Sequence, residues 1–220
     1  MSEIFHDLKD VTVRGISVSE MSNNVYLVTS KADGAQLLID AADDATAITG
    51  LIASAANDAK LPASLVGIAT THQHWDHIRA LKELADSTGV KTFAGADDAA
   101  GILEGSSVST DVPLTHGDTV SVGTTELECV HLRGHTPGSI AYVLRDSSGV
   151  VLIFSGDSLF PGGVGNTGDD PGRFTSLLDD VTVRLFGHYP DESLVLPGHG
   201  SSTTLGAERP HLGEWRSRGW

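Results

Sequence analysis

The sequence predicts an α/β (α+β) fold in which two β-sheets pack against each other and helices cover their outer faces. In both halves of the chain, short apolar segments with β-branched residues are followed by segments with helical periodicity. Packing two sheets together with helices outside buries the apolar face of every layer. The chain has 220 residues, is 40% hydrophobic and lacks a linker-like break or repeat, so we expect one domain over residues 1–220.

The elements of the first half follow from the spacing of their apolar residues. We expect strands at residues 11–18, 24–29, 35–41, 65–70 and 90–94. We expect helices at residues 44–59, 76–88 and 97–103. Ile48, Leu51 and Ala55 give the first helix an apolar face, and Gly89 marks the end of the second.

The second half begins with four short strands separated by Gly-rich turns, at residues 119–122, 126–132, 139–145 and 150–155. A Gly-rich loop at 161–172, a helix at 174–186 and a strand at 194–196 follow. The chain's one cysteine, Cys129, lies in a predicted strand, so no internal disulfide forms. We interpret Cys129 as a small buried apolar residue rather than a reactive thiol.

Four potential metal ligands occur within six residues of Thr71-His72-Gln73-His74-Trp75-Asp76-His77, between a predicted strand and a predicted helix. Residues two apart in an extended stretch point the same way, so His72 and His74 can bind one ion. Asp76 and His77 follow as the chain turns and point toward a second ion. Packing alone rarely gathers such residues, because burying them costs desolvation.

Three further candidates follow buried strands or lie in turns between strands. His135 lies in a Gly- and Pro-containing turn, Asp157 ends a buried strand, and His199 follows a buried strand between two glycines. The remaining histidines lack this setting and are left out of the site: His6, His116, His131, His188 and His211. Asp40 also ends an apolar strand, and two roles stay open for it: capping a turn or helix, and orienting metal ligands.

These motifs together resemble the metallo-β-lactamase fold superfamily, and within it the glyoxalase II-like hydrolases. The resemblance covers about residues 20–205. It rests on five motifs in the expected order: Leu-Ile-Asp-Ala at Asp40, Thr-His-x-His-x-Asp-His at 71–77, Gly-His-Thr-Pro-Gly-Ser at His135, Ser-Gly-Asp-Ser-Leu-Phe at Asp157 and Pro-Gly-His-Gly at His199. It implies an αββα four-layer sandwich with a metal centre at one edge of the two sheets.

The resemblance also implies how the ligands are shared between two divalent cations. The first cation is bound by His72, His74 and His135. The second is bound by Asp76, His77 and His199, and Asp157 bridges the two. Zinc suits this ligand set, and iron or manganese also fits it.

The activity implied by the resemblance is hydrolysis of a thioester of a low-molecular-weight thiol, by a metal-bound hydroxide that Asp76 helps to orient. Two alternatives stay open on the same fold: a persulfide dioxygenase with a single iron, and a hydrolase of lactones or other esters. The chain departs from glyoxalase II after the metal loop, where Arg79-Ala80 replaces Gly-Gly, and after Asp157, where Gly163-Val164-Gly165-Asn166 replaces Gly-Cys-Gly-Arg. Most of the C-terminal helical region that holds glutathione in those enzymes is also missing.

Substrate contacts are expected in the loop after Asp157, and the candidates are Phe160, Asn166 and Arg173. Two interpretations stay open for the C-terminal cluster: a solvated segment with a few packed aromatic residues, or a clamp for an anionic thiol carrier. That cluster consists of Arg209, Trp215, Arg216, Arg218 and Trp220.

The formal net charge of −15 and the absence of a Lys/Arg cluster argue against a nucleic-acid partner. No apolar run is long enough to span a bilayer, and residues 1–10 carry no signal-peptide pattern, so we expect a cytoplasmic protein without a membrane partner. We therefore expect a small-molecule substrate. The sequence does not indicate the oligomeric state.

Overall fold

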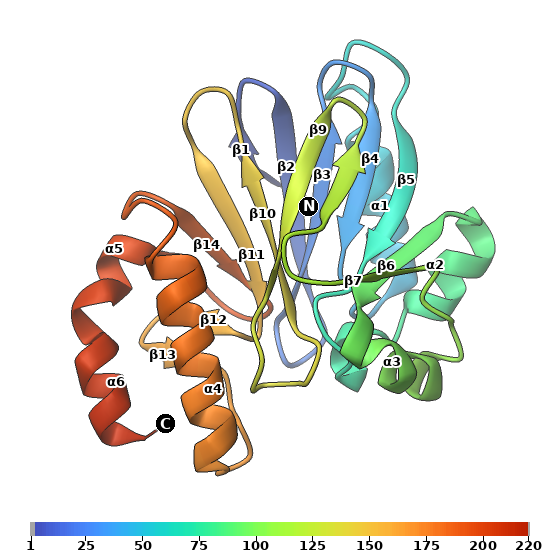
Figure 1. The fold of residues 1–220 in the computed structure, drawn as a ribbon. Coiled ribbons are helices and arrows are strands. Elements are labelled where there is room, and N and C mark those ends of the chain that lie inside the picture. The colour runs from blue at the N-terminus through green and yellow to red at the C-terminus, as the bar shows by residue number, and fades with distance from the viewer. Residues whose placement is uncertain (1–2, 220) are drawn as a thin grey trace.

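The computed structural model describes residues 3–219, and its two large sheets face each other across the middle of the molecule (Figure 1). Seven strands form the first sheet in sequence order: β1 (Glu3–Asp7), β2 (Val11–Val18), β3 (Asn23–Ser30), β4 (Ala35–Ile39), β5 (Ser64–Ala69), β6 (Lys91–Gly95) and β7 (Val112–Leu114). Six strands form the second in the order β15 (Thr203–Thr204), β14 (Leu194–Pro197), β11 (Val151–Gly156), β10 (Ile140–Arg145), β9 (Thr125–His131) and β8 (Thr119–Val122). A small hairpin pairs β12 (Leu159–Phe160) with β13 (Gly163–Val164).

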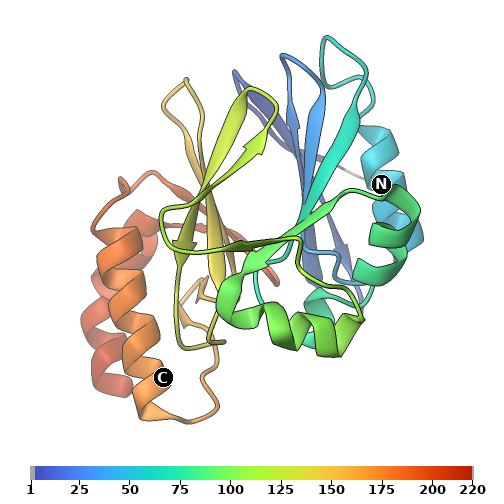
Figure 2. The same cartoon turned by 45° about the vertical axis from the view of Figure 1, so that its right-hand side comes forward.

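Helices cover both outer faces of the sandwich (Figures 1 and 2). On the first sheet these are α1 (Ala45–Ser54), α2 (Leu81–Thr88) and α3 (Ala99–Ser106), with short 3₁₀ turns at Trp75–His77 and Ala96–Asp98. On the second sheet these are α4 (Pro171–Val181), α5 (Leu205–Glu208) and α6 (Leu212–Arg218), with a π-turn at Thr182–Phe186 and a 3₁₀ turn at Arg209–His211. The αββα sandwich expected from the sequence is therefore confirmed.

Three apolar clusters hold the four layers together. The central cluster lies between the sheets and includes Tyr26, Tyr142 and Phe154. The second packs α1, α2 and α3 on the first sheet, and the third packs α4, the π-turn and α6 on the second. Because the sheets share one cluster, the loops at their edges are held at a fixed distance from one another.

Parallel pairing brings the ligand-bearing loops to one edge of the sandwich. In the first sheet, β4 pairs in parallel with β5, and β5 with β6, so the loop after β5 leaves at the same edge as the ends of β4 and β6. In the second sheet, β11 pairs in parallel with β14, which places Asp157 and His199 side by side at the strand ends. Bonds across this edge join the sheets, among them Ile140 N–H to the Thr71 carbonyl at 2.8 Å.

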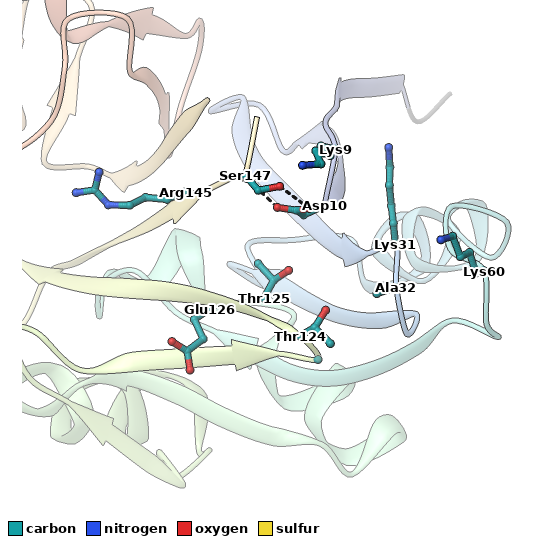
Figure 3. Close-up of a pocket in the computed structure, with 11 residues that line it drawn as sticks. Lys9, Asp10, Lys31, Ala32, Lys60, Thr124, Thr125, Glu126, Arg145 and Ser147 are labelled. Carbon is teal, nitrogen blue, oxygen red and sulfur yellow. Dashed lines mark hydrogen bonds between the residues drawn. The ribbon is translucent and has the colours of Figure 1, made fainter. Parts of the chain in front are cut away.

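The opposite edge is closed by a different set of turns. The Asp146 carboxylate accepts hydrogen bonds from the backbone N–H groups of Lys9 and Asp10, at 3.3 and 2.7 Å. Asp10 in turn accepts from the backbone N–H and hydroxyl of Ser147 (Figure 3). A cavity of about 710 Å³ opens beside this joint, and Lys31 on its wall is paired with Asp7. These bonds join the β1–β2 turn of the first sheet to the β10–β11 turn of the second.

The structure differs from several expected boundaries. The helix expected from Asp76 begins at Leu81, because the preceding residues form a 3₁₀ turn and Ala80 N–H bonds to the Ala41 carbonyl outside the helix. The helix expected to reach residue 59 ends at Ser54, and Asp58 instead forms a bidentate pair with Arg14. The sequence pattern also misses the short elements β1, β7, β12, β13, β15, α5 and α6.

The described part of the C-terminal cluster is helical, with one buried aromatic residue and partly exposed arginines. Trp215 is 1% exposed within the third apolar cluster. Arg209 pairs with Asp191, Arg216 with Asp179 and Arg218 with Glu214, and Trp220 lies outside the described residues. This arrangement supports the interpretation of a solvated segment with packed aromatic residues over that of a clamp for an anionic thiol carrier.

Two further properties of the described chain follow from burial and length. Cys129 is 0% exposed, and burial raises the pKa of its thiol to about 12, which agrees with a role as a small apolar residue. Within residues 3–219, no helix combines the length and apolar character needed to cross a bilayer.

We expect Trp215→Ala to lower the free energy of unfolding by about 3–5 kcal/mol, because the change leaves a cavity under α6. Val183→Ala is the matched control, since Val183 is 64% exposed and should change the free energy by less than about 0.5 kcal/mol. Urea unfolding of both variants measures the difference. Equal midpoints for the two would show that α6 adds nothing to the core.

Candidate metal centre

The seven predicted ligand side chains come together at one edge of the sandwich, from four separate loops. Within the described residues, three groups have ligand atoms within 4.8 Å of one another. These groups are His72, His74 and His135; Asp76, His77 and His199; and His72, His77 and Asp157. The other described histidines, including His131, which bonds to the Pro137 carbonyl, lie outside these groups.

The first group consists of three imidazoles that face a common point. His72 Nε2 lies 3.1 Å from His74 Nδ1 and 3.3 Å from His135 Nε2. The opposite nitrogen of His135 donates its hydrogen to the Asn166 carbonyl at 2.7 Å, so Nε2 is left as a bare acceptor. His72 Nδ1 donates to the Thr71 hydroxyl at 3.0 Å, which leaves its Nε2 bare as well.

The second group combines two imidazoles with a carboxylate. His199 Nε2 lies 3.1 Å from His77 Nε2 and 3.2 Å from Asp76 Oδ2. His199 Nδ1 donates to the Met21 carbonyl at 2.9 Å. Asn23 Nδ2 donates to both Asp76 Oδ2 and the Asp76 carbonyl, at 3.0 and 3.1 Å, and this fixes the carboxylate.

Asp157 lies between the two groups. Its Oδ2 is 3.6 Å from His135 Nε2 in the first group and 3.5 Å from His199 Nε2 in the second. Its Oδ1 lies 3.4 Å from His77 Nε2 and is buried without a hydrogen-bond partner among the described residues.

The residues present fit metal ions. Two bare imidazole nitrogens, His72 Nε2 and His135 Nε2, face each other with their lone pairs, which is unfavourable without a cation. A buried carboxylate oxygen without a donor carries a comparable cost, and Asp157 Oδ1 is such an atom. Imidazole and carboxylate ligands in groups of three suit zinc and also iron or manganese.

The pKa shifts of the side chains separate the two groups. Burial lowers the pKa of His135 to about 4 against the opposing charge of Asp157, and burial also lowers the pKa of His72 and His74. The first group is therefore neutral and ready to bind a cation. Hydrogen bonds to Asp157 and Asp76 instead raise the pKa of His199 to about 10, so this imidazole is protonated and positively charged.

A single buried carboxylate, Asp40, orients imidazoles of both groups. Asp40 Oδ2 accepts from His77 Nδ1–H at 2.8 Å and from the Thr71 hydroxyl, also at 2.8 Å, and Thr71 in turn accepts from His72. Asp40 Oδ1 accepts from Thr71 N–H at 2.7 Å. The residue that caps α1 is Asp44, whose Oδ1 accepts from Ala47 N–H at 3.0 Å.

The predicted substrate contacts occupy three different settings. Arg173 donates to the carbonyls of Gly134 and His135, and it lines a cavity of about 800 Å³ with His74, His135 and Arg133. Asn166 bonds to His135 through its carbonyl and lines a neighbouring cavity of about 500 Å³. Phe160 lies in the β12–β13 hairpin opposite Gly163.

Two buried polar residues support the site without a sequence signal that marks them. Asn23 begins β3 and reaches Asp76 from 53 positions away. Asp98 is 0% exposed and bonds to the residues that follow His72 and His135.

Comparisons with known proteins agree with this geometry. The family model described as the metallo-beta-lactamase superfamily matches residues 18–205. The probable metallo-hydrolase YqgX of Bacillus subtilis is 33% identical over 158 residues, which are 66% of this chain and 72% of that protein. The hydroxyacylglutathione hydrolase GloC of Haemophilus influenzae is 27% identical over 164 residues, 68% of this chain and 76% of that protein.

Solved structures show the same similarity. ETHE1 from Myxococcus xanthus matches with a TM-score of 0.77 and 29% identity, over 93% of this chain and 84% of that one. TTHA1623 in a di-iron-bound form matches with a TM-score of 0.69 and 27% identity, over 89% and 96%. Because the family model spans most of the chain and the ligand groups are in place, this protein belongs to the metallo-beta-lactamase superfamily of metal-dependent hydrolases.

Proposed function

We propose that the protein hydrolyses the thioester of a low-molecular-weight thiol with two divalent cations, preferably zinc. The observation that carries the proposal is the pair of three-residue ligand groups with Asp157 between them. The similarity to a hydroxyacylglutathione hydrolase supports the thioester as substrate.

Two cations bound at these groups would lower the pKa of a shared water toward neutrality and polarise the substrate carbonyl. The chain supplies the positioning. The Asp76 carboxylate, held by Asn23, would orient the attacking water by accepting a hydrogen from it. The cavity beside His74 and His135 is where the thiol carrier would bind. On its wall, Arg173 donates to the Gly134 and His135 carbonyls, and Arg133 is paired with Asp180.

We also propose a binding partner and a cellular compartment for the protein. The partner is a small molecule and not a nucleic acid or membrane, which agrees with the net charge of −15. Low-molecular-weight thiols are kept reduced in the cytoplasm, and an enzyme acting on their acyl derivatives belongs there.

One observation favours a second candidate, a persulfide dioxygenase with a single iron. His72, His77 and Asp157 form a two-histidine, one-carboxylate group within the same site. Such a facial triad is typical of non-haem iron enzymes that use oxygen. The two candidates therefore differ in metal stoichiometry and in their need for oxygen.

Adding zinc to the metal-free protein should restore thioester hydrolysis fully at two equivalents, in air and without oxygen alike. The assay follows thiol release from acylated thiols, with a lactone and an oxygen ester as comparison substrates. Full activity at one equivalent of iron, together with oxygen uptake on a thiol persulfide, would support the dioxygenase instead. Turnover confined to lactones or oxygen esters would reject the thioester.

His74→Ala should abolish most activity and weaken metal binding by more than about 100-fold, since losing a mere hydrogen-bonding partner of a ligand costs 10–100-fold. His211→Ala is the matched control, because His211 lies on the surface and contacts Glu214. Competition with a chromophoric chelator measures both affinities. Equal metal affinity and turnover in the two variants would remove His74 from the site.

Metal binding to the second group should weaken as the pH falls. In the metal-free protein His199, with its pKa raised to about 10, is protonated at neutral pH, so a cation must displace that proton. The affinity of this group should fall up to about tenfold per pH unit between pH 9 and 6. The first group, where the pKa of His135 is lowered to about 4, should stay nearly constant over that range.

Proton release measured in weak buffer at pH 7.5 tests this directly. The equivalent that fills the second group should release at least one proton, because, against its burial, the Asp40 carboxylate also raises the pKa of His77, and the other equivalent should release none. Two equivalents with the same proton release would contradict the assigned difference between the groups.

A further inference from the structure

We propose that Asp98 is a positioning residue that assembles the first metal group by joining the two loops that carry its ligands. The inference rests on the metal binding in the proposed function and not on the thioester. Asp98 lies where the 3₁₀ turn after β6 leads into α3, and it is no member of the three ligand groups.

The two carboxylate oxygens of Asp98 accept hydrogen bonds from both ligand loops. Oδ2 accepts from Gln73 N–H at 2.9 Å, and Gln73 stands between His72 and His74 in the first loop. Oδ2 also accepts from the Thr136 hydroxyl at 2.6 Å, and Oδ1 accepts from Gly138 N–H at 2.7 Å. Thr136 follows His135, so one side chain is bonded to a residue adjacent to each of the three imidazoles of the group.

The chain is built to allow this close contact. A Cβ atom on Gly138 would stand 2.3 Å from Asp98 N, and one on Gly95 would stand 1.9 Å from the Gly138 carbonyl oxygen. Side chains at either position would push the two loops apart. The turn after β6 and the β9–β10 loop thus approach each other closely because both have glycine at the contact.

The three donors require a carboxylate at this position. Asp98 is 0% exposed, and its burial raises the pKa of the carboxyl, while the bonds that it accepts from two backbone N–H groups and one hydroxyl act against this rise. An Asn side chain offers one oxygen, and its amide hydrogens would face at least one of these donors. The loops would then lose a bond on one side and the imidazoles their fixed spacing.

The chain offers a matched control at the opposite edge of the sandwich. Asp146 is 5% exposed and, like Asp98, accepts three hydrogen bonds, here all from backbone N–H groups, those of Lys9, Asp10 and Ser148. It likewise joins turns from the two sheets; its partner Asp10 is drawn in Figure 3. Asp146→Asn therefore removes the same kind of clamp at a place far from the metal ligands.

The test is zinc titration of the metal-free wild type, Asp98→Asn and Asp146→Asn in competition with a chelator, together with urea unfolding of each metal-free protein. Both variants should lose stability. Asp98→Asn should weaken the binding of one of the two zinc equivalents about 10–100-fold and leave the affinity for the other unchanged. Asp146→Asn should leave the affinity for both equivalents unchanged. Unchanged zinc affinity in Asp98→Asn, or equal weakening in Asp146→Asn, would overturn the proposal.

A double variant identifies the affected group. His74→Ala already weakens zinc binding by the first group, so adding Asp98→Asn to it should lower the zinc affinity little further. If the losses of zinc affinity from the two changes are additive, Asp98 acts elsewhere and the assignment is overturned. If Asp98→Asn fails to fold, Thr136→Val removes one of the three bonds and should weaken the same equivalent by a smaller factor. A wild-type protein that binds no zinc would overturn the proposed function itself, an outcome distinct from failure of Asp98 alone.

Discussion

The Asp40 carboxylate is 2% exposed, stands at the end of β4 and accepts hydrogens from the Thr71 backbone, the Thr71 hydroxyl and the His77 ring. Through Thr71 it also determines which nitrogen of His72 carries a hydrogen. One buried charge therefore fixes the tautomers of two imidazoles that belong to different ligand groups. With those tautomers set, the Nε2 atoms point inward as bare acceptors. Asp157, placed between the groups by the end of β11, lies 3.4 Å from His77 Nε2 and 3.6 Å from His135 Nε2.

The two packed sheets hold these ligand residues in a stable arrangement. Each sheet supplies part of the ligand set, since His72, His74, Asp76 and His77 follow β5 while His135, Asp157 and His199 come from the second sheet. The shared central cluster sets the separation of the sheets, and hydrogen bonds across the edge, such as Tyr142 to the Thr70 carbonyl, set their register. Ligands on rigid strand ends lose little entropy when a cation binds, which favours tight binding.

The sequence predicts much of this because its signals are local. The long strands and α4 bury an apolar face, and periodicity reveals such a face, whereas α5, α6 and the two-residue strands are too short to show one. The start of the helix near Asp76 is wrong because the histidine loop holds the chain in a tertiary arrangement that propensity does not encode. The ligand residues stand in compact motifs, but Asn23 and Asp98 act across 53 and 38 positions of sequence, so no motif can display them.

The burial of Cys129 bears on the fate of the reaction product. The proposed thioester hydrolysis would release a free thiol at the site, and such a thiol, once oxidised to a disulfide, exchanges with accessible protein thiolates. The chain has one cysteine, enclosed in the central cluster with its thiol pKa raised to about 12. It offers no thiolate for a mixed disulfide and no partner for an internal one. If the proposed thioester hydrolysis holds, the protein can release a thiol without forming a mixed disulfide through its own cysteine.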